Sequence, residues 1–358
     1  MDCQDALLIR RPNDLDARWL EDILASGGTR ARISGIKSEP VGTGQLGDTI
    51  RIFIDSEDGD APSSVIAKFP AESEISRSLA KGWRLYRREI GFYTDLAKAA
   101  KVTTPRCFSA VIDEKDEFVL VLEDLSKAKA GDQISGLSLD NAIICVKEAA
   151  RLHSSFWDIA SGQSQGWLDA GEVSQPFYTE EVLTKSWPIF HDRYADIMSK
   201  DMIMVCEALS ENYSDYIKPL ARPRCVTHND FRPDNILFCD GRAYVVDWQS
   251  CAIGYNAVDV SFLIGGSFGR EDRKLSESRL LSAYHEELIN GGVAGYSLSD
   301  LSDDYRHFSF AGINVSVGAA VMVNRTERGD RMFLTMLQRH VEHVLDSGAL
   351  DILSGHKK

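Results

Sequence analysis

The chain has 358 residues, of which 44% are hydrophobic and 26% are charged, and its formal net charge is −14. A chain of this length and composition can bury a large core and is expected to form two lobes. The negative charge argues against the broad basic surface that nucleic-acid binding needs, so no nucleic acid is expected as a partner.

The cysteines and apolar segments predict a cytoplasmic protein. The seven cysteines are scattered and never have C-x-x-C spacing, which argues against a disulfide framework or a zinc cluster and favours a reducing compartment. The first residues lack the basic and long apolar segments of a secretory signal. The longest apolar window, residues 313–323, is shorter than the roughly 20 residues of a membrane span. We therefore expect a core helix there and no membrane span.

The predicted elements change in type near residue 125. Strand-like segments come first, and helical patterns prevail later. The predicted strands are residues 49–55, 63–69 and 117–124, interrupted by a helix at 83–101, and the later predicted helices are 139–157, 276–290 and 331–346. This order predicts an α+β fold with a small β-rich N-terminal lobe, residues 1–124, and a larger, mainly helical C-terminal lobe, residues 125–358. A ligand is expected between lobes.

A glycine-rich turn precedes the first of these strands. Gly42, Gly44 and Gly47 lie in the segment GTGQLGD. Glycines at this density let backbone amides approach an anionic group closely. Ordinary loop chemistry explains most such turns, so phosphate contact is indicated only together with other motifs.

Lys68 and Glu89 form a predicted ion pair. Lys68 lies in SSVIAKF, where alternation puts it on the same face as Ile66. An isolated strand lysine more often reaches water. Glu89, however, lies four residues after Leu85, on the apolar stripe of the following helix. A carboxylate that points into the core needs a partner, and Lys68 is the obvious one.

The segment HNDFRPDNILFCDGRAYVVDWQ, residues 228–249, predicts a tight hairpin. Its two halves are short, apolar and β-prone, and the D-G pair between them is a strong turn signal. Asn235 and Asp247 each lie six residues from Gly241, so we expect them opposite each other at the open end. Paired carboxylate and amide oxygens suit Mg²⁺, which leaves its other positions to water and substrate phosphates. Asp230, on the loop before the hairpin, is placed to act on a nucleophile.

Together these elements resemble the protein-kinase-like fold. The strand lysine, the helix glutamate, the connector LVLEDLS, HNDFRPDN and VVDWQ follow in the order of that fold over about residues 40–265. HNDFRPDN matches the kinase catalytic-loop pattern, and D-W-Q stands where D-F-G sits. Because no long segment ending in A-P-E follows, no protein substrate is expected.

Within this fold, the chain resembles the aminoglycoside phosphotransferase and choline kinase superfamily. The resemblance is carried by RREIGFYTDLAKAAKVTTPR, by RLHSSFW at residues 151–157 and by Asp259. The E-D-L of the connector and D-W-Q are similar to ecdysteroid kinase-like members. The resemblance implies an enzyme, a small-molecule kinase that moves the γ-phosphate of ATP to a hydroxyl of a small molecule.

The resemblance also implies a role for each motif residue. ATP is the expected nucleotide, with GTP as the alternative. Its adenine is expected at the connector backbone near Glu123 and Leu125, and its phosphates under the glycine-rich turn. The remaining expected roles are charge neutralisation of the α- and β-phosphates by Lys68 held by Glu89, Mg²⁺ binding by Asn235 and Asp247, general base catalysis by Asp230, and stabilisation of the transferring phosphoryl group by Arg232.

Structural roles are expected for the remaining polar residues of these motifs. His228 is expected to order the catalytic loop through its backbone, Asp259 to accept hydrogen bonds, and His153 to be a core histidine. His340 and His343 have the i, i+3 spacing of a metal pair, but no third ligand is evident in the sequence. We therefore expect them at the surface near a helix end.

The acceptor substrate stays open in the sequence. Rings crowd one region: Phe156, Trp157, Trp167, Phe177, Tyr178, Trp187, Phe190 and Tyr194. They line a pocket for a hydrophobic alcohol, or with nearby carboxylates hold a cation such as an aminoglycoside or choline, or only pack the lobe, which is favoured. The alternative class is a catalytically idle kinase-like nucleotide-binding or scaffold protein, which has no chemical need for the complete motif set.

Overall fold

The computed structural model describes residues 9, 11–42, 46–57, 61–159, 166–168 and 179–353. The chain divides into two compact units. The first unit comprises Met1–Ala99, Thr104–Ala128 and Val246–Gln249, and the second comprises Ala100–Thr103, Lys129–Val245 and Ser250–Lys358. The first unit therefore extends to Ala128 rather than to residue 124, and it takes in the D-W-Q segment from far along the chain.

The first unit contains a five-stranded antiparallel sheet in the order β1-β2-β3-β5-β4. All three predicted strands are found in it. The elements of this unit are η2 (Pro12–Asp14), α1 (Ala17–Ser26), β1 (Ile33–Pro40), β2 (Gly47–Ser56), β3 (Ser64–Pro70), α2 (Glu74–Gly82), α3 (Leu85–Gly91), the π-helix η3 (Phe92–Leu96), β4 (Cys107–Ile112) and β5 (Phe118–Glu123). The predicted helix at 83–101 is shorter and ends in this π-helical turn.

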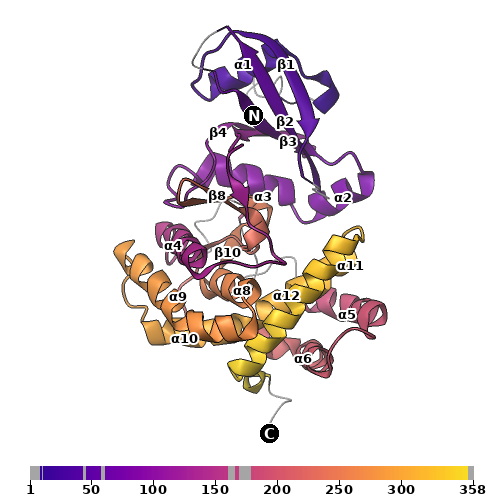
Figure 1. Ribbon diagram of the computed structural model, residues 1–358, viewed down its shortest axis with the longest axis vertical. Helices are drawn as coiled ribbons and strands as arrows, with labels where there is room; N and C mark the ends of the chain where they lie inside the picture. Colours follow the sequence, from indigo (N-terminus) through magenta and orange to yellow (C-terminus); the bar gives the residue numbers. More distant parts are fainter. Residues whose placement is uncertain are drawn as a thin grey trace. The chain divides into compact units, whose positions relative to one another are not determined.

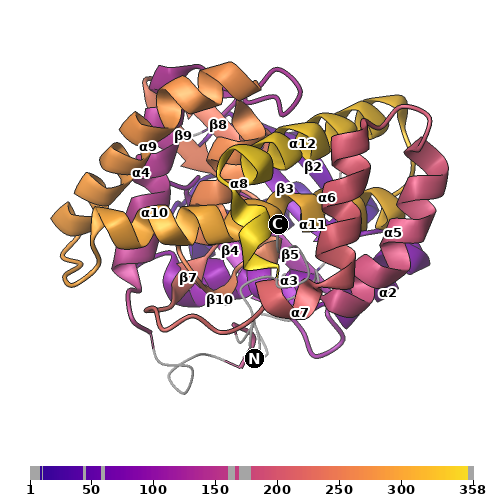
Figure 2. The same ribbon diagram turned by 90° about the horizontal axis from the view of Figure 1, so that it is seen from below.

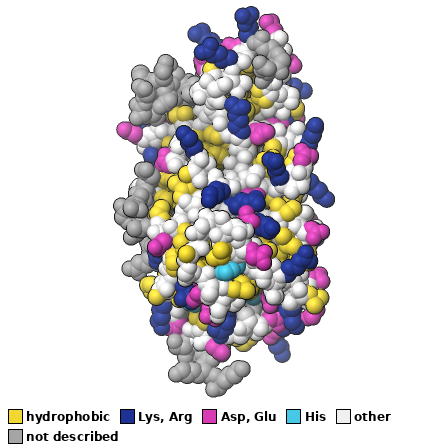
Figure 3. All heavy atoms as spheres, turned by 90° about the vertical axis from the view of Figure 1, so that its left-hand side faces the viewer, with side chains coloured by type: hydrophobic (Ala, Val, Ile, Leu, Met, Phe, Trp, Pro, Cys, Tyr) yellow, Lys and Arg dark blue, Asp and Glu magenta, His cyan; other side chains and the backbone are white. Residues whose placement is uncertain are grey.

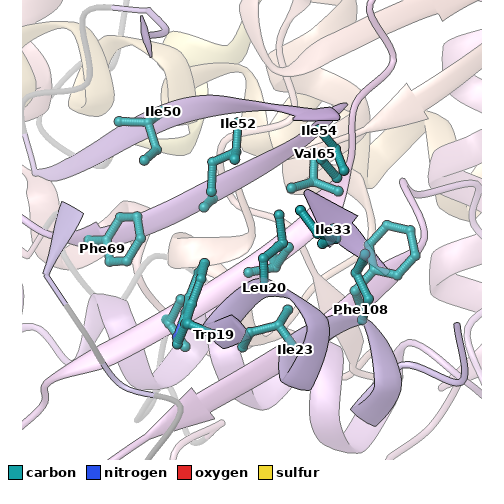
Figure 4. Close-up of a cluster of buried hydrophobic side chains, with 14 residues drawn as sticks. Trp19, Leu20, Ile23, Ile33, Ile50, Ile52, Ile54, Val65, Phe69 and Phe108 are labelled. Atoms are coloured by element: carbon teal, nitrogen blue, oxygen red, sulfur yellow. The ribbon is translucent and has the colours of Figure 1, made fainter. Parts of the chain in front are cut away.

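Helix α1 covers one face of this sheet with apolar side chains (Figure 4). Trp19 and Leu20 of α1 pack in one buried cluster with Ile52, Val65 and Phe69 of the sheet. Full burial of such a side chain stabilises the fold by roughly 1.5–3 kcal/mol. Successive residues of a strand face opposite sides, so residues that alternate with this cluster, Lys68 among them, lie on the other face.

The second unit is mainly helical, so the predicted α+β class is confirmed (Figure 1). Its small sheets pair β6 (Lys129–Ala130) with β8 (Ile236–Cys239) and β9 (Arg242–Val245), and β7 (Cys225–Thr227) with β10 (Ala252–Gly254). Its helices are α4 (Leu139–Ser155), α5 (Glu180–Tyr194), α6 (Lys200–Glu211), α7 (Tyr213–Tyr216), η5 (Pro233–Asn235), α8 (Ala257–Ser267), α9 (Arg270–Asn290), α10 (Leu298–His307), η7 (Phe308–Phe310), α11 (Ala311–Met322), α12 (Glu327–Asp346) and η8 (Ala349–Ile352). A further turn, η6 (Trp248–Ser250), bridges the boundary between units.

The three helices predicted after residue 125 exist with shifted boundaries. Helix α9 begins at Arg270 rather than at residue 276, and it ends before Gly291 as predicted. Helix α12 begins at Glu327 because the side chain of Thr326 accepts a hydrogen bond from the amide of Gly329, at 3.0 Å. Helix α4 lies beside α9, and α12 packs on α8 and α11 (Figures 1 and 2).

Helix α11 is the predicted core helix near residues 313–323. Its residues are buried all round, from Ala311 to Gly318, as expected of a helix that is apolar on every face. No helix within the described ranges is both long and apolar enough to cross a membrane. On the face drawn in Figure 3, basic side chains lie among acidic ones.

The prediction that His340 and His343 lie at the surface is wrong. Their exposed fractions are 0% and 1%. Glycines make this burial possible, because a Cβ added at Gly265 would lie 2.8 Å from Nδ1 of each histidine, and one added at Gly312 would lie 2.0 Å from His340 Nε2. His340 stacks on Phe262 with ring centroids 5.5 Å apart. Their ring nitrogens have no hydrogen-bond partner among the described residues.

We expect Gly312→Ala to destabilise the protein, although alanine is the better helix former by about 1 kcal/mol. The added methyl would overlap the ring of His340, and such overpacking costs about 1–3 kcal/mol. Urea denaturation measures the change. Gly82→Ala is the control, since nothing lies within 4 Å of its added Cβ. The double variant Gly312→Ala, His340→Ala should recover part of the loss, and equal loss in the single and double variants would contradict the steric cause.

We also expect a steep loss of stability in acid. Burial, together with Arg273 and Arg339, lowers the pKa of His340 from 6.5 to about 3. A depressed histidine pKa gives stability that is present above 6.5 and is lost as the pH falls towards the folded-state value. His340→Gln should therefore flatten the dependence of unfolding free energy on pH by about 1.4 kcal/mol per pH unit in that window. Urea denaturation between pH 7 and 4 measures the slope, and an unchanged slope would contradict the buried neutral state.

Candidate active site

Within the first unit, Lys68 stands between two carboxylates. Its Nζ lies 2.5 Å from Oε1 of Glu89 and 3.5 Å from Oδ1 of Asp247. The side chain of Glu89 is 6% exposed and that of Lys68 is 22% exposed, so Glu89 is the more deeply buried partner. The predicted pairing of Lys68 with Glu89 is confirmed by this distance. Asp247 is a second partner, which the sequence did not suggest.

The charges of these three groups depend on one another. Burial by itself would lower the pKa of Lys68, but the negative charges of Glu89 and Asp247 outweigh it and raise that pKa. Burial raises the pKa of Glu89, an effect that the charge of Lys68 opposes. Lys68 therefore stays protonated, and it is the cation that keeps a buried carboxylate tolerable.

The D-W-Q segment is fixed by its tryptophan. The ring of Trp248 is fully buried and stacks on Phe92 of η3, with centroids 3.5 Å apart and 3° between planes. Asp247, one residue earlier, has a φ of 69°, a left-handed conformation that is uncommon outside glycine. A buried anchor next to a sparsely populated backbone conformation fixes the backbone position at Asp247.

The glycine-rich turn and the connector lie in the same unit. Gly42 has a φ of +75° and Gly47 begins β2, whereas Gly44 is outside the described residues. At the connector, the amide of Glu123 donates to the carbonyl of Arg106 at 2.8 Å, and the carbonyl of Leu125 accepts from Ala128 at 2.8 Å.

Asp124 of the connector points back into the first unit. It accepts hydrogen bonds from Arg51 Nε at 2.7 Å and from Ser64 Oγ at 2.6 Å, and its side chain is 3% exposed. The sequence-based predictions assign no role to this side chain, which directly follows the last residue of β5. Asp124 ties the connector to β2 and β3.

In the second unit, the catalytic-loop motif gathers its polar side chains around Asp230. Arg232 Nε donates to Asp230 Oδ1 at 2.9 Å, and Asn235 Nδ2 donates to Asp230 Oδ2 at 2.7 Å and to its carbonyl at 2.9 Å. Arg232 Nη1 also lies 3.0 Å from Asp234 Oδ2. The structure thus brings three predicted residues together. Asp234 was not predicted, although its position two residues after Arg232 was a usable signal.

A buried carboxylate anchors the backbone of this loop. Asp259 accepts hydrogen bonds from the amides of His228 and Asn229, both at 2.7 Å, and its Oδ2 lies 3.1 Å from His153 Nε2. The other ring nitrogen of His153 lies 2.8 Å from the hydroxyl of Tyr284. His153 is a core histidine and Asp259 an acceptor, as predicted. His228 is buried, and its Nδ1 accepts from the amide of Asp230 at 3.3 Å.

The predicted hairpin exists, with a register one residue away from the expected one. Strand β8 pairs with β9 from Ile236 opposite Val245 to Cys239 opposite Arg242. Asp240 and Gly241 form the turn, and both have the positive φ, 50° and 72°, of a primed hairpin turn. The pairing is centred between these two residues rather than on Gly241. Asn235 and Asp247 are therefore not related as a directly opposed pair.

The side-chain oxygens of Asn235 and Asp247 are of the chemical type that Mg²⁺ prefers. Because Asn235 donates both described bonds through Nδ2, its carbonyl oxygen is oriented away from Asp230. Among the described residues, no group of three or more His, Cys, Asp and Glu side chains gathers as a metal site. Mg²⁺ takes amide and carboxylate oxygens from the protein and fills the rest of its shell with water and phosphate, so it needs no larger group of protein ligands.

The ring-rich region divides between packing and the ranges that the structure does not describe. Trp187, Phe190 and Tyr194 of α5 are 9%, 0% and 2% exposed, as expected of rings that pack helices. Trp157 is half-buried and meets Tyr296 edge to face at 5.2 Å. Of the other predicted rings, Phe156 and Trp167 are half-buried, and Phe177 and Tyr178 lie outside the described residues.

We expect Asp259→Asn to destabilise the second unit. The amide nitrogen that replaces one oxygen cannot accept from a backbone N–H, so a buried donor loses its partner at a cost of about 1–3 kcal/mol. Thermal and urea unfolding measure this loss. Asp303→Asn, on the exposed face of α10, is the matched control and should change stability by less than about 0.5 kcal/mol. Equal effects of both substitutions would contradict the anchoring role.

Several solved structures resemble this chain in fold. Choline kinase from Cryptosporidium parvum Iowa II is 13% identical with a TM-score of 0.56, over 89% of this chain and 92% of that chain. Plasmodium vivax ethanolamine kinase is 10% identical with a TM-score of 0.53, over 85% and 82%. The aminoglycoside phosphotransferase APH(2'')-IIa, solved in a ternary complex with streptomycin and ATP, is 15% identical with a TM-score of 0.50, over 92% and 99%. At these identities the likeness shows the fold, which is the predicted kinase-like one.

The sequence itself carries the family. No curated protein matches it. The model of the ecdysteroid kinase-like family matches residues 46–291. Because this match covers more than half of the chain, the protein is a member of the ecdysteroid kinase-like family and, as that membership indicates, a small-molecule kinase.

Proposed function

We propose that this protein is an ATP-dependent phosphotransferase that moves the γ-phosphoryl group to a hydroxyl of a small molecule. The observation that carries the proposal is Lys68, which Glu89 holds at 2.5 Å and which faces Asp247 at 3.5 Å. In kinases, the phosphates of the nucleotide are bound by a protonated strand lysine together with a carboxylate that binds Mg²⁺. Lys68 and Asp247 have these two side-chain types.

The first unit supplies the nucleotide-binding groups in this proposal. Lys68 neutralises the charge of the α- and β-phosphates, and the backbone amides around Gly42 and Gly47 cover them. The connector backbone near Glu123 and Leu125 binds the adenine. GTP is the alternative nucleotide, and the same groups would serve it.

The second unit supplies the base. The carboxylate of Asp230, directed by Arg232 and Asn235, takes the proton of the substrate hydroxyl. The hydroxyl oxygen forms a bond to the γ-phosphorus while the bond from that phosphorus to the β–γ bridging oxygen breaks, which releases ADP. Arg232 places positive charge beside this transfer. Positioning and charge stabilisation account for most of the catalysis in such reactions.

Asn235 and Asp247 would hold Mg²⁺, which supplies charge neutralisation to the phosphates when bound. The oriented amide of Asn235 and the left-handed Asp247 are the reasons for choosing these two residues.

The acceptor is proposed to be a small alcohol. The family description favours hydrophobic, steroid-like alcohols. Choline-type alcohols and aminoglycosides follow, because the proteins of like fold include a choline kinase and an aminoglycoside phosphotransferase.

We expect Asp230→Asn to reduce turnover by about 100-fold or more, since a positioned general base contributes roughly 10²–10⁴-fold. A coupled ADP-release assay with Mg²⁺ and ATP measures this against hydrophobic alcohols, amino alcohols and aminoglycosides. Asp240→Asn is the matched control. Asp240 is an exposed residue of the hairpin turn with a φ of 50°, which asparagine tolerates.

Two outcomes would contradict the proposal. Turnover that survives in Asp230→Asn would remove this residue as the base. Failure of Mg²⁺ and ATP to raise the melting temperature of the wild-type protein, together with absence of ADP release, would remove the nucleotide-dependent function itself.

A further inference from the structure

An arginine at the start of α12 reaches the loop that carries Asp230. Arg328 Nη2 lies 3.1 Å from Asp132 Oδ2 and 3.4 Å from both carboxylate oxygens of Asp234. Its Nη1 lies 3.4 Å from Asp234 Oδ2. One side chain thus joins three segments of the second unit that are far apart in the sequence: the turn after β6, the catalytic loop and α12.

Asp234 is the centre of these contacts. Besides Arg328, it accepts a hydrogen bond from the amide of Gln133 at 2.7 Å and lies 3.0 Å from Arg232 Nη1. Its side chain is 16% exposed, so its charge is only partly screened by water. With a backbone amide on one side and arginines on others, this carboxylate has one favourable position.

Arg232 contacts both Asp234 and Asp230, so the position of one carboxylate affects that of the other. Its Nη1 is directed at Asp234 and its Nε at Asp230, at 2.9 Å. A guanidinium is planar and its donors are fixed in direction, so a shift of one partner turns the plane and moves the donor that faces the other. Arg328, Asp234, Arg232 and Asp230 therefore form a row of alternating charges that ends on the base.

Close backbone packing leaves this row little slack. A Cβ added at Gly131 would lie 2.3 Å from the carbonyl oxygen of Pro233, so the two backbones touch there. The amide of Gly131 also donates to the carbonyl of Ile236 at 2.9 Å. The turn after β6 and the catalytic loop are thus packed directly on each other. Arg339 of α12 also holds this turn, since it donates to the carbonyls of Gln133 and Ile134 at 2.8 Å, but Arg328 is the one of these two arginines that reaches Asp234 of the catalytic loop.

We propose that Arg328 is a positioning residue for catalysis: through Asp234 and Arg232 it fixes the direction of the Asp230 carboxylate. The inference rests on the proposed function for its catalytic consequence, but its structural consequence is independent of it. Its side chain is 56% exposed, and exposed ion pairs contribute little to global stability. Loss of Arg328 should therefore disturb the catalytic loop without unfolding the protein.

The chain offers a matched control in Arg325. Both arginines lie at or near the start of α12 and are about equally exposed, 57% for Arg325 and 56% for Arg328. Both have an acidic partner, but Arg325 pairs with Asp330 of α12 itself, at 2.7 Å. Of these two arginines, Arg328 has described contacts with the catalytic loop, and Arg325 has none there.

The test compares Arg328→Ala, Arg328→Lys and Arg325→Ala. Hydrogen exchange of the peptides that cover residues 129–136 and 228–239 should rise in Arg328→Ala and stay at the wild-type level in Arg325→Ala. The kcat for ADP release with Mg²⁺ and ATP should fall by about 10-fold or more in Arg328→Ala, because small displacements of a reacting group are costly. The KM for ATP should change by less than about 3-fold, since the proposed function gives Arg328 no contact with the nucleotide.

Each outcome decides the inference. Partial recovery of both exchange protection and kcat in Arg328→Lys would support it, because the charge is kept. Unchanged exchange in Arg328→Ala, or equal changes in Arg325→Ala, would overturn it. If the wild-type protein released no ADP that depends on Asp230, the proposed function would fail, and the exchange comparison alone would still decide whether Arg328 holds the loop.

Discussion

The site of the second unit depends on the hydrogen bonds that the Asp259 carboxylate accepts from the backbone of the catalytic loop. Buried backbone amides need partners, and the loop at His228 and Asn229 turns too sharply to find them in a strand, as the φ of 61° at Asn229 shows. Asp259 accepts both amides and is itself oriented by His153. Helices α4 and α8 thereby fix where the loop begins, and the side chains around Asp230 can only arrange themselves from that point onward.

In the first unit, the central interaction is the ion pair between Lys68 of β3 and the buried Glu89. The face of β3 that meets α1 is purely apolar, and the opposite face carries Lys68 half-buried beside Glu89. Replacing a buried ion pair by apolar residues often leaves stability unchanged or raises it, so stability alone gives no reason to keep this one. A lysine whose pKa is raised by two carboxylates stays charged, and a fixed positive charge on a rigid strand is useful chiefly for binding anions.

Local signals predicted much of this arrangement. The hairpin follows from a D-G turn between two apolar runs, and Lys68 pairs with Glu89, only 21 residues away, because a buried acid needs a cation. Partners that lie far apart in the sequence were missed. Arg51 meets Asp124 across 73 residues, and Arg328 meets Asp234 across 94. No periodicity links such pairs, and each exposed arginine of a helix start looks the same in the sequence.

The burial of His340 shows a second limit. Whether a histidine on an amphipathic helix faces water or the core depends on the helix opposite, and here the room comes from glycines at Gly265 of α8 and Gly312 of α11. Glycine inside a helix weakens it by about 1 kcal/mol relative to alanine, so two glycines facing one ring indicate close packing that outweighs local propensity. A prediction that treats each helix alone takes these glycines as residues that destabilise their helices, and it places the histidines at the surface. The contact between the helices explains both the glycines and the buried histidines, because the rings occupy the space that a Cβ at each glycine would fill.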